Sequence, residues 1–240
     1  MKKLLFLLLL VPILGMSQTK NVVSTFRAFP KVDKVLEFEA ALAAHAQKYH
    51  TGDWRWRVFE ISSGPDYGGY HITEGPTSWT AFDTRGNLGT EHNNDWNRKV
   101  AIYLTDKQST NGYFAFQDSL STVGISDYAD NIIINHIYPK PGMVLQTGEM
   151  IGKQRKVWAA GNESVAVYTA VNSGPQSFAV VTRLKGGLKE LEPGYRAPFP
   201  QRFDAVNGEG AWGYYLEDYA KYVESRWSEM LSLRADLSSK

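Results

Sequence analysis

The feature that most constrains the fold of this chain is an internal duplication. The matching pairs are residues 29–31 with 138–140, 35–36 with 144–145, 62–65 with 172–175, Trp96 with Trp212, and 114–116 with 231–233. The order of the matches is kept, and the offset grows slowly from 109 to 117 positions, as expected for a duplicated unit with small insertions. A period of this length is too long for a solenoid and predicts two similar domains.

The first copy has the pattern of alternating strands and amphipathic helices. Residues 21–29 alternate and are rich in Val, Thr and Phe, which predicts a strand, whereas apolar residues recur at helical spacing in residues 31–49. We expect strands over residues 21–29, 54–61, 69–73 and 113–120, and helices over residues 31–49 and around Trp96. The order of elements in this copy is therefore βαββαβ.

The second copy repeats this order. We expect strands over residues 132–138, 164–171, 178–184 and 230–237, helices over residues 143–158 and 212–227, and a Gly- and Pro-rich surface loop over residues 185–211. The domain boundaries that follow are residues 18–120 for the first repeat, 121–131 for a linker and 132–240 for the second repeat.

A βαββαβ unit folds into a four-stranded antiparallel sheet with both helices on one face, which is the ferredoxin-like arrangement. The other, open face of the sheet must be covered. The expected fold is therefore α+β, with two tandem ferredoxin-like units whose antiparallel sheets pack face to face as an α+β barrel. In element order and in its strand-Pro-Lys-helix opening, the chain resembles the dimeric α+β barrel superfamily, which includes antibiotic-biosynthesis-monooxygenase-like, haem-degrading and chlorite-dismutase-like proteins. The resemblance carries no catalytic motif, so no catalytic residue is assigned from it.

The N-terminus has the pattern of a signal peptide. Lys2 and Lys3 precede an apolar run over residues 4–14, and residues 15–17 present small residues at a cleavage site. The apolar run is too short for a membrane span of about 20 residues. We expect residues 1–17 to be removed, the product to be periplasmic or secreted, and no membrane span to remain.

Composition excludes several classes of function. The 240 residues carry a formal net charge of +1, which argues against nucleic acid as a partner. The chain has no Cys, so disulfides, Cys-ligated metal centres and thiol nucleophiles are ruled out.

Strand alternation predicts which side chains face the barrel interior. In the first copy this set is polar and cationic, whereas the corresponding positions in the second copy include Val165, Val167 and Val180. The candidate ligand-binding residues are Arg27, Arg55, Arg57, His71, Tyr113, His136 and Arg234.

An apolar wall with a few converging arginines suits a small organic anion. Haem also fits this description, with His71 or His136 as axial ligand. We expect a small-molecule-binding protein with no cofactor otherwise assigned, because the inferred interior holds no carboxylate to complete an acid–base pair. The alternatives are a haem-degrading or cofactor-poor monooxygenase-like enzyme, and an interaction module using residues 185–211.

Simpler interpretations stay open for several of these residues. Arg55 and Arg57 could face water on an edge strand, and His71 could be an ordinary half-buried histidine. His45 and His50 are interpreted as structural. Residues 92–95 are not expected to bind a metal ion, because no second pair of ligands has suitable spacing and Asp95 is interpreted as a helix N-cap. The halves could also close on a second chain, which would give a homodimer.

Overall fold

The computed structural model describes residues 19–107 and 111–240. The predicted signal peptide, residues 1–17, lies outside the described residues. Within the described ranges, no helix has both the length and the apolar character that a membrane crossing requires.

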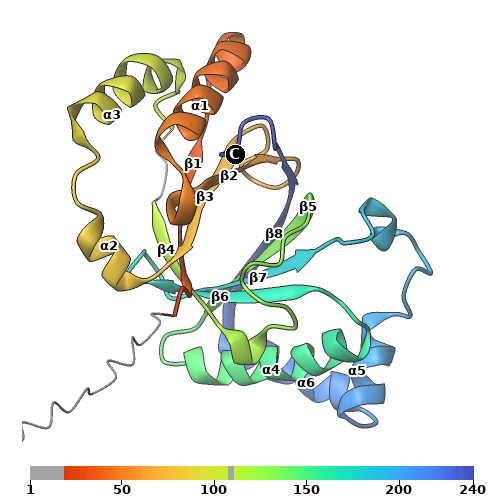
Figure 1. The fold of residues 1–240 in the computed structure, drawn as a ribbon. Coiled ribbons are helices and arrows are strands. Elements are labelled where there is room, and N and C mark those ends of the chain that lie inside the picture. Colours follow the sequence, from red (N-terminus) through yellow and green to blue (C-terminus); the bar gives the residue numbers. More distant parts are fainter. Residues whose placement is uncertain (1–18, 108–110) are drawn as a thin grey trace, which may run out of the picture.

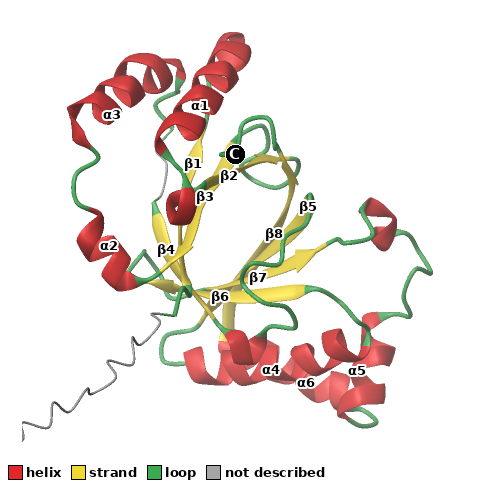
Figure 2. Cartoon of the chain, in the orientation of Figure 1, coloured by secondary structure: helices red, strands yellow, loops and turns green. Residues whose placement is uncertain are grey.

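Eight antiparallel strands form one closed barrel (Figure 2). They are β1 (Val22–Ala28), β2 (Trp56–Ile61), β3 (Tyr70–Thr77), β4 (Gly112–Phe116), β5 (Asn131–Pro139), β6 (Val165–Val171), β7 (Phe178–Arg183) and β8 (Val223–Leu233). The helices are α1 (Val35–Tyr49), α2 (Trp79–Arg85), α3 (Gly89–Asp95), α4 (Val144–Ala160), α5 (Phe199–Asn207) and α6 (Ala211–Tyr222). The α+β class and the barrel predicted from the sequence are confirmed.

The order of strands around the barrel is the same in the two halves of the chain. The first half runs β4-β1-β3-β2 and the second runs β8-β5-β7-β6. The halves join by hydrogen-bonded pairs at both edges, β2 with β8 and β4 with β6. The two sheets are thus continuous through these seams, whereas the sequence led us to expect two sheets merely stacked face to face.

The helices lie outside the barrel in two groups. Figure 1 shows α1, α2 and α3 against the first half and α4, α5 and α6 against the second. Under α1, a core of residues that includes Phe38, Leu42 and Val58 is fully buried. Ile151 of α4 packs in the same way against Val165 on the second half. These two cores lie between the helices and the outer faces of the strands. The inward-facing side chains of the strands form a separate core inside the barrel.

The end of the second half differs from the sequence expectation. The predicted helix over residues 212–227 ends at Tyr222, and the following strand β8 begins at Val223 rather than at residue 230. The helical spacing of the tyrosines masked a period-two pattern, in which Trp227 and Glu229 lie on the same face of the strand as Leu231. The predicted surface loop over residues 185–211 also contains α5, whose Phe203 is fully buried.

Several strands present the opposite face from the one predicted. Phe114 on β4 points into the barrel, and the ring of Tyr113 packs against Trp79 and Phe82 of α2. In the second half, the predicted interior valines, Val165, Val167 and Val180, lie under α4 instead. A shift of one residue reverses the face of every side chain in a strand. Because both faces of these strands carry apolar residues, alternation could not show which face points into the barrel.

Candidate functional site

The barrel interior contains a cavity with about 750 Å³ of empty space, including the part open to solvent. Its walls are mainly apolar, and the few polar side chains come from β1, β2, β3, β5, β6, β7 and the segment that precedes β5. The polar and aromatic residues that line it include Arg57, His71, Tyr128, His136, Tyr168 and Arg183. No Asp or Glu is among the described residues that line the cavity. The site is therefore apolar with a net positive charge.

Arg57 is the candidate residue whose surroundings match the prediction most closely. Its guanidinium lies 3.6 Å from the ring centroid of Tyr128, and Nη1 donates a hydrogen bond of 2.9 Å to the carbonyl of Gly75. No carboxylate pairs with it in the described part of the chain. Burial lowers the pKa of Arg57. An anion entering the cavity would relieve the cost of this buried, uncompensated charge.

Arg183 is a second lining arginine, and it joins the cavity to the segment that precedes β5. Its Nη1 donates to the carbonyl of Gly124 at 3.0 Å, and its Nη2 donates to Tyr168 Oη at 3.2 Å. This segment, predicted as a linker over residues 121–131, supplies Ile125, Tyr128 and Ala129 to the cavity wall. The linker is therefore a wall of the site as well as a connection.

His71 lines the cavity and is only 8% exposed. Its Nδ1 is buried and has no hydrogen-bond partner within the described ranges. Burial, assisted by the positive charge of Arg27, lowers the pKa of His71 to about 3. The imidazole is therefore neutral at physiological pH. Its register opposite Arg27, with β3 beside β1, is as predicted.

Glu229 on β8 is a buried carboxylate next to the cavity. His136 Nε2 lies 2.7 Å from its Oε1, and Arg27 Nη1 donates to its Oε2 at 2.9 Å. Burial pushes the pKa of Glu229 upward, but these hydrogen bonds outweigh it and lower the pKa to about 2. Arg27 also pairs with Asp66 at 2.6 Å. Its charge is thus balanced by two carboxylates, so Arg27 is less suited than Arg57 to binding a ligand anion.

Three predicted site residues lie away from the cavity. Arg55 is exposed, precedes β2 and donates to the carbonyl of Gly52. Tyr113 lies on the outer face of β4. Arg234 follows β8 and pairs with Glu39 and Asp236. Arg57, His71 and His136 are the predicted residues that the structure brings together around the cavity.

Sequence reasoning missed Glu229 and Arg183. Glu229 was missed because residues up to 227 were assigned to a helix, and its presence corrects the expectation that the interior holds no carboxylate. Arg183 lies at the end of β7, two residues beyond Val181 on the same face, so a shift in the assigned face hid it. Correct alternation in β7 and β8 would have found both residues.

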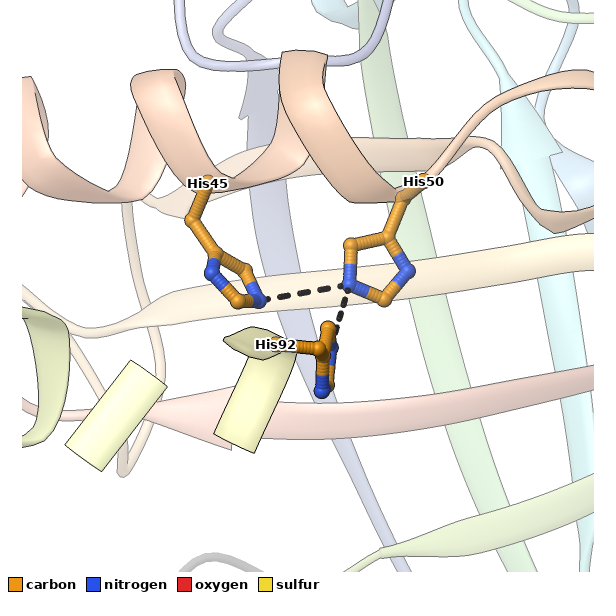
Figure 3. Close-up of side chains that lie close together, drawn as sticks. All are labelled: His45, His50 and His92. Carbon is orange, nitrogen blue, oxygen red and sulfur yellow. Dashed lines mark hydrogen bonds between the residues drawn. The ribbon is translucent and has the colours of Figure 1, made fainter. Parts of the chain in front are cut away.

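A second polar cluster lies outside the barrel. His45 and His50 come from α1 and its C-cap, and His92 comes from α3 (Figure 3). Their ligand nitrogen atoms lie within 4.8 Å of one another. The sequence did not lead us to expect further ligands beside His92, and the structure corrects this point. That residues 92–95 bind no metal ion stays a prediction. Asp95 precedes the helical turn Trp96–Val100, but its side chain makes no capping hydrogen bond there. Its carboxylate accepts a hydrogen bond from His45 Nδ1 at 2.9 Å instead.

Comparison with known proteins places the fold. No protein-family model and no curated protein matches the sequence. Among solved structures, an anthrone oxidase-like protein aligns with a TM-score of 0.58 and 11% identity, over 90% of this chain and 92% of that one. A chlorite dismutase from Candidatus Nitrospira defluvii, in complex with imidazole, aligns with a TM-score of 0.55 and 9% identity, over 91% and 93%.

A candidate monooxygenase from Lactobacillus acidophilus NCFM is similar to the same extent, with a TM-score of 0.53, 10% identity and coverage of 92% and 96%. The chain has the dimeric α+β barrel fold. At these identities the likeness concerns the fold alone, so the function of this chain has to be argued from its own cavity.

Proposed function

We propose that the barrel cavity binds a small organic anion with a flat, apolar body. One observation carries the proposal: Arg57 and Arg183 line a cavity to which no described carboxylate contributes. Arginine pairs with carboxylates in a planar fork, and the apolar walls favour the rest of such a ligand. Tyr128, which stacks on Arg57, would form one side of the binding site.

The test compares an aromatic carboxylate, 1-naphthoate, with its neutral amide, 1-naphthamide, by isothermal titration calorimetry. We expect the carboxylate to bind at least tenfold more tightly, because only the anion compensates the charge of Arg57. Arg57→Gln should remove this preference. Arg55→Gln is the matched control, since Arg55 is exposed and outside the cavity, and should leave it unchanged. Equal binding of amide and acid by the native protein would contradict the proposal.

A cofactor-independent oxygenase is the second candidate function, and His71 favours it. A neutral imidazole with an unpartnered Nδ1 can accept a proton from an activated CH₂ group of the ligand. A bound anion would raise the pKa of His71 and so strengthen it as a base. The carbanion then reacts with O₂, and a CH₂ group and O₂ become a ketone and water. The fold it shares with the anthrone oxidase-like protein supports this choice of reaction.

Anthrone is a suitable probe for this activity, because anthrone and O₂ together balance to anthraquinone and water. Oxygen uptake and the absorbance of the quinone measure the same turnover independently. We expect His71→Gln to lower the rate at least 100-fold, in keeping with the loss of a general base. Arg55→Gln should leave the rate unchanged. Native protein that oxidises anthrone no faster than buffer would contradict the oxygenase proposal but not the binding proposal.

The same residues meet the basic requirements of haem, so haem is a ligand to test. His71 would hold the haem iron, and Arg57 and Arg183 would pair with the propionates. Haem, when bound, would supply an iron that activates oxygen. Addition of hemin should shift the Soret band in the native protein and in His92→Ala, which lies outside the barrel. The shift should be lost in His71→Ala. An unshifted band in the native protein would exclude haem as the ligand.

We also propose that the two halves are tandem ferredoxin-like units, at residues 18–120 and 132–240, produced by duplication. The shared strand order of the two halves and the matched sequence pairs support this. The leader pattern in residues 1–17 supports export from the cytoplasm. Expression in a bacterium followed by N-terminal sequencing of the periplasmic or secreted product tests export, and a mature chain beginning at Gln18 is the expected result.

A further inference from the structure

The three histidines outside the barrel converge through the same ring atom. Figure 3 shows His45 and His50 pointing down from one helix and its end toward His92. His50 Nε2 lies 3.4 Å from His45 Nε2 and 3.4 Å from His92 Nε2. His50 follows the last residue of α1 with φ −114° and ψ 85°, and this non-helical backbone lets a residue five positions after His45 turn toward it.

The opposite nitrogen of each ring is held by an oxygen. His45 Nδ1 donates to Asp95 Oδ2 at 2.9 Å, and His50 Nδ1 donates to Glu74 Oε2 at 3.0 Å. His92 Nδ1 lies 3.1 Å from Asn93 Oδ1. Because a carboxylate can only accept, each Nδ1 facing one carries the ring proton. When His45 and His50 are neutral, their Nε2 atoms therefore carry lone pairs.

Two nitrogen lone pairs that face each other at short distance repel, and a positive charge between them relieves this repulsion. A neutral ring that already donates from Nδ1 has no proton on Nε2, so the two Nε2 contacts of 3.4 Å cannot both be ordinary hydrogen bonds. His45 and His50 are 0% and 2% exposed, so water does not easily separate them.

We propose that His45, His50 and His92 bind one divalent transition-metal ion of the Zn²⁺ class through their Nε2 atoms. Two imidazole nitrogens held about 2.05 Å from a tetrahedral ion lie about 3.3 Å apart, close to the separations in this cluster. The widest separation is no more than 4.8 Å, and rotation of the half-buried His92 side chain closes it. Three nitrogen ligands favour Zn²⁺, Co²⁺ or Ni²⁺ over Mg²⁺ and Ca²⁺, which prefer oxygen.

The surroundings match those of a metal site. Histidine ligands typically donate their other ring N–H to a carboxylate, as His45 and His50 do. The ring of His50 also stacks on Trp56 at 3.6 Å between centroids, which fixes its plane. Glu74 is fully engaged with His50, Arg85 and Trp56, so it serves as a positioning residue. Three protein ligands leave a fourth position for water or a small ligand.

The ion would also attach α3 to α1. The helix α3 has no buried residue of its own, so apolar packing holds it weakly. A bond from His92 to an ion shared with His45 and His50 would tie the two helices together. Metal binding should therefore slow amide hydrogen exchange in α3 by at least tenfold and leave exchange in α4 unchanged.

The experiment uses untagged full-length protein, stripped with EDTA and titrated with ZnCl₂ by calorimetry. We expect one Zn²⁺ per chain and no binding of Mg²⁺ under the same conditions. Co²⁺ should give the visible absorption of a low-coordinate nitrogen site. Asp95→Asn, which weakens the orientation of His45, should reduce the affinity 10- to 100-fold.

Ligand variants decide the assignment. His92→Ala, at a half-buried position that does not threaten folding, should lower the affinity at least 100-fold while circular dichroism stays native. His136→Gln, which removes a histidine from the barrel, should bind Zn²⁺ like the native protein. Absence of stoichiometric binding in the native protein, or binding that His92→Ala leaves unchanged, would overturn the proposal. Neither result depends on the ligand of the barrel cavity, so the two sites are tested separately.

Discussion

At the scale of single residues, Arg27 and Arg57 have the same side chain but different partners, and therefore different roles. Arg27 is balanced by Glu229 and Asp66, whereas Arg57 is held by a carbonyl and an aromatic ring. The first is part of a buried ion-pair network, and the second keeps an uncompensated charge. We therefore assign Arg27 to stability and Arg57 to ligand binding.

This difference predicts the effect of removing Arg27. In Arg27→Ala, Glu229 loses its cation while staying buried, and breaking a buried pair in this way costs about 3–5 kcal/mol in free energy of unfolding. Urea denaturation measures the loss. The double variant Arg27→Ala/Glu229→Gln should recover at least half of it, because the charge left unpaired is then removed. A loss below about 1 kcal/mol in the single variant would contradict a structural role for Arg27.

The candidate site was only partly predictable from the sequence at this scale. Alternation placed Arg57 and His71 inside the barrel because the other face of β2 and β3 is clearly apolar. That outer face carries Trp56, Val58, Tyr70 and Ile72. It failed for Tyr113, because both faces of β4 are aromatic. It could not find the cluster of His45, His50 and His92, because spacing along the chain does not reveal that a separate helix supplies the third ring.

At the scale of elements, the turn between β2 and β3 packs against the buried ion pairs of Arg27 and Glu229. Asp66 in this turn pairs with Arg27, and Gly64 packs directly on Glu229. Gly64 has a φ of +97°, and a Cβ there would lie 2.9 Å from Glu229 Cβ. The glycine thus permits both the turn and the close approach of β8.

Substitution of two glycines of the turn can separate backbone strain from the contact with β8. Gly64→Ala should lose stability through both strain and the contact with Glu229, about 2–4 kcal/mol in total. Gly68 has a φ of +78°, and a Cβ added there would meet no atom within 4 Å, so Gly68→Ala should lose only the strain energy, about 1–2 kcal/mol. Equilibrium urea denaturation compares the two variants. Equal losses would mean that the contact with β8 has no energetic effect.

Most elements were predictable because their periodicity is strong. The predicted helices over residues 31–49 and 143–158 correspond to α1 and α4 within a few residues, since each carries an apolar stripe that packs on the barrel. The boundary between α6 and β8 was not predictable in the same way. Its polar residues fit an exposed helix as well as a strand, and only pairing with β5 and β2 selects the strand.

At the scale of the whole molecule, buried histidines couple stability to pH. His71 and His50 are neutral in the folded protein, with pKa values lowered by burial to about 3 and about 4 from an ordinary value of 6.5. The unfolded chain therefore binds more protons than the folded one between those values and 6.5. Stability is fully present above pH 6.5 and falls as the pH drops toward 4.

We expect the free energy of unfolding to decrease over this window by up to about 1.4 kcal/mol per pH unit for each of the two histidines. Urea denaturation at several pH values between 7 and 4 measures the slope in metal-free protein. His71→Gln should reduce the slope, whereas Arg55→Gln should keep it. A stability that is constant from pH 7 to pH 4.5 would contradict the assignment of these rings as neutral.

Closure of the barrel at two seams has a consequence for synthesis of the chain. The outer edge of β2 finds its partner only in β8, the last strand to leave the ribosome. Until then the nascent polypeptide carries unpaired strand edges, which readily join other chains. Folding to completion is thus deferred to the end of translation, and loss of the final strand would leave an aggregation-prone half-open sheet.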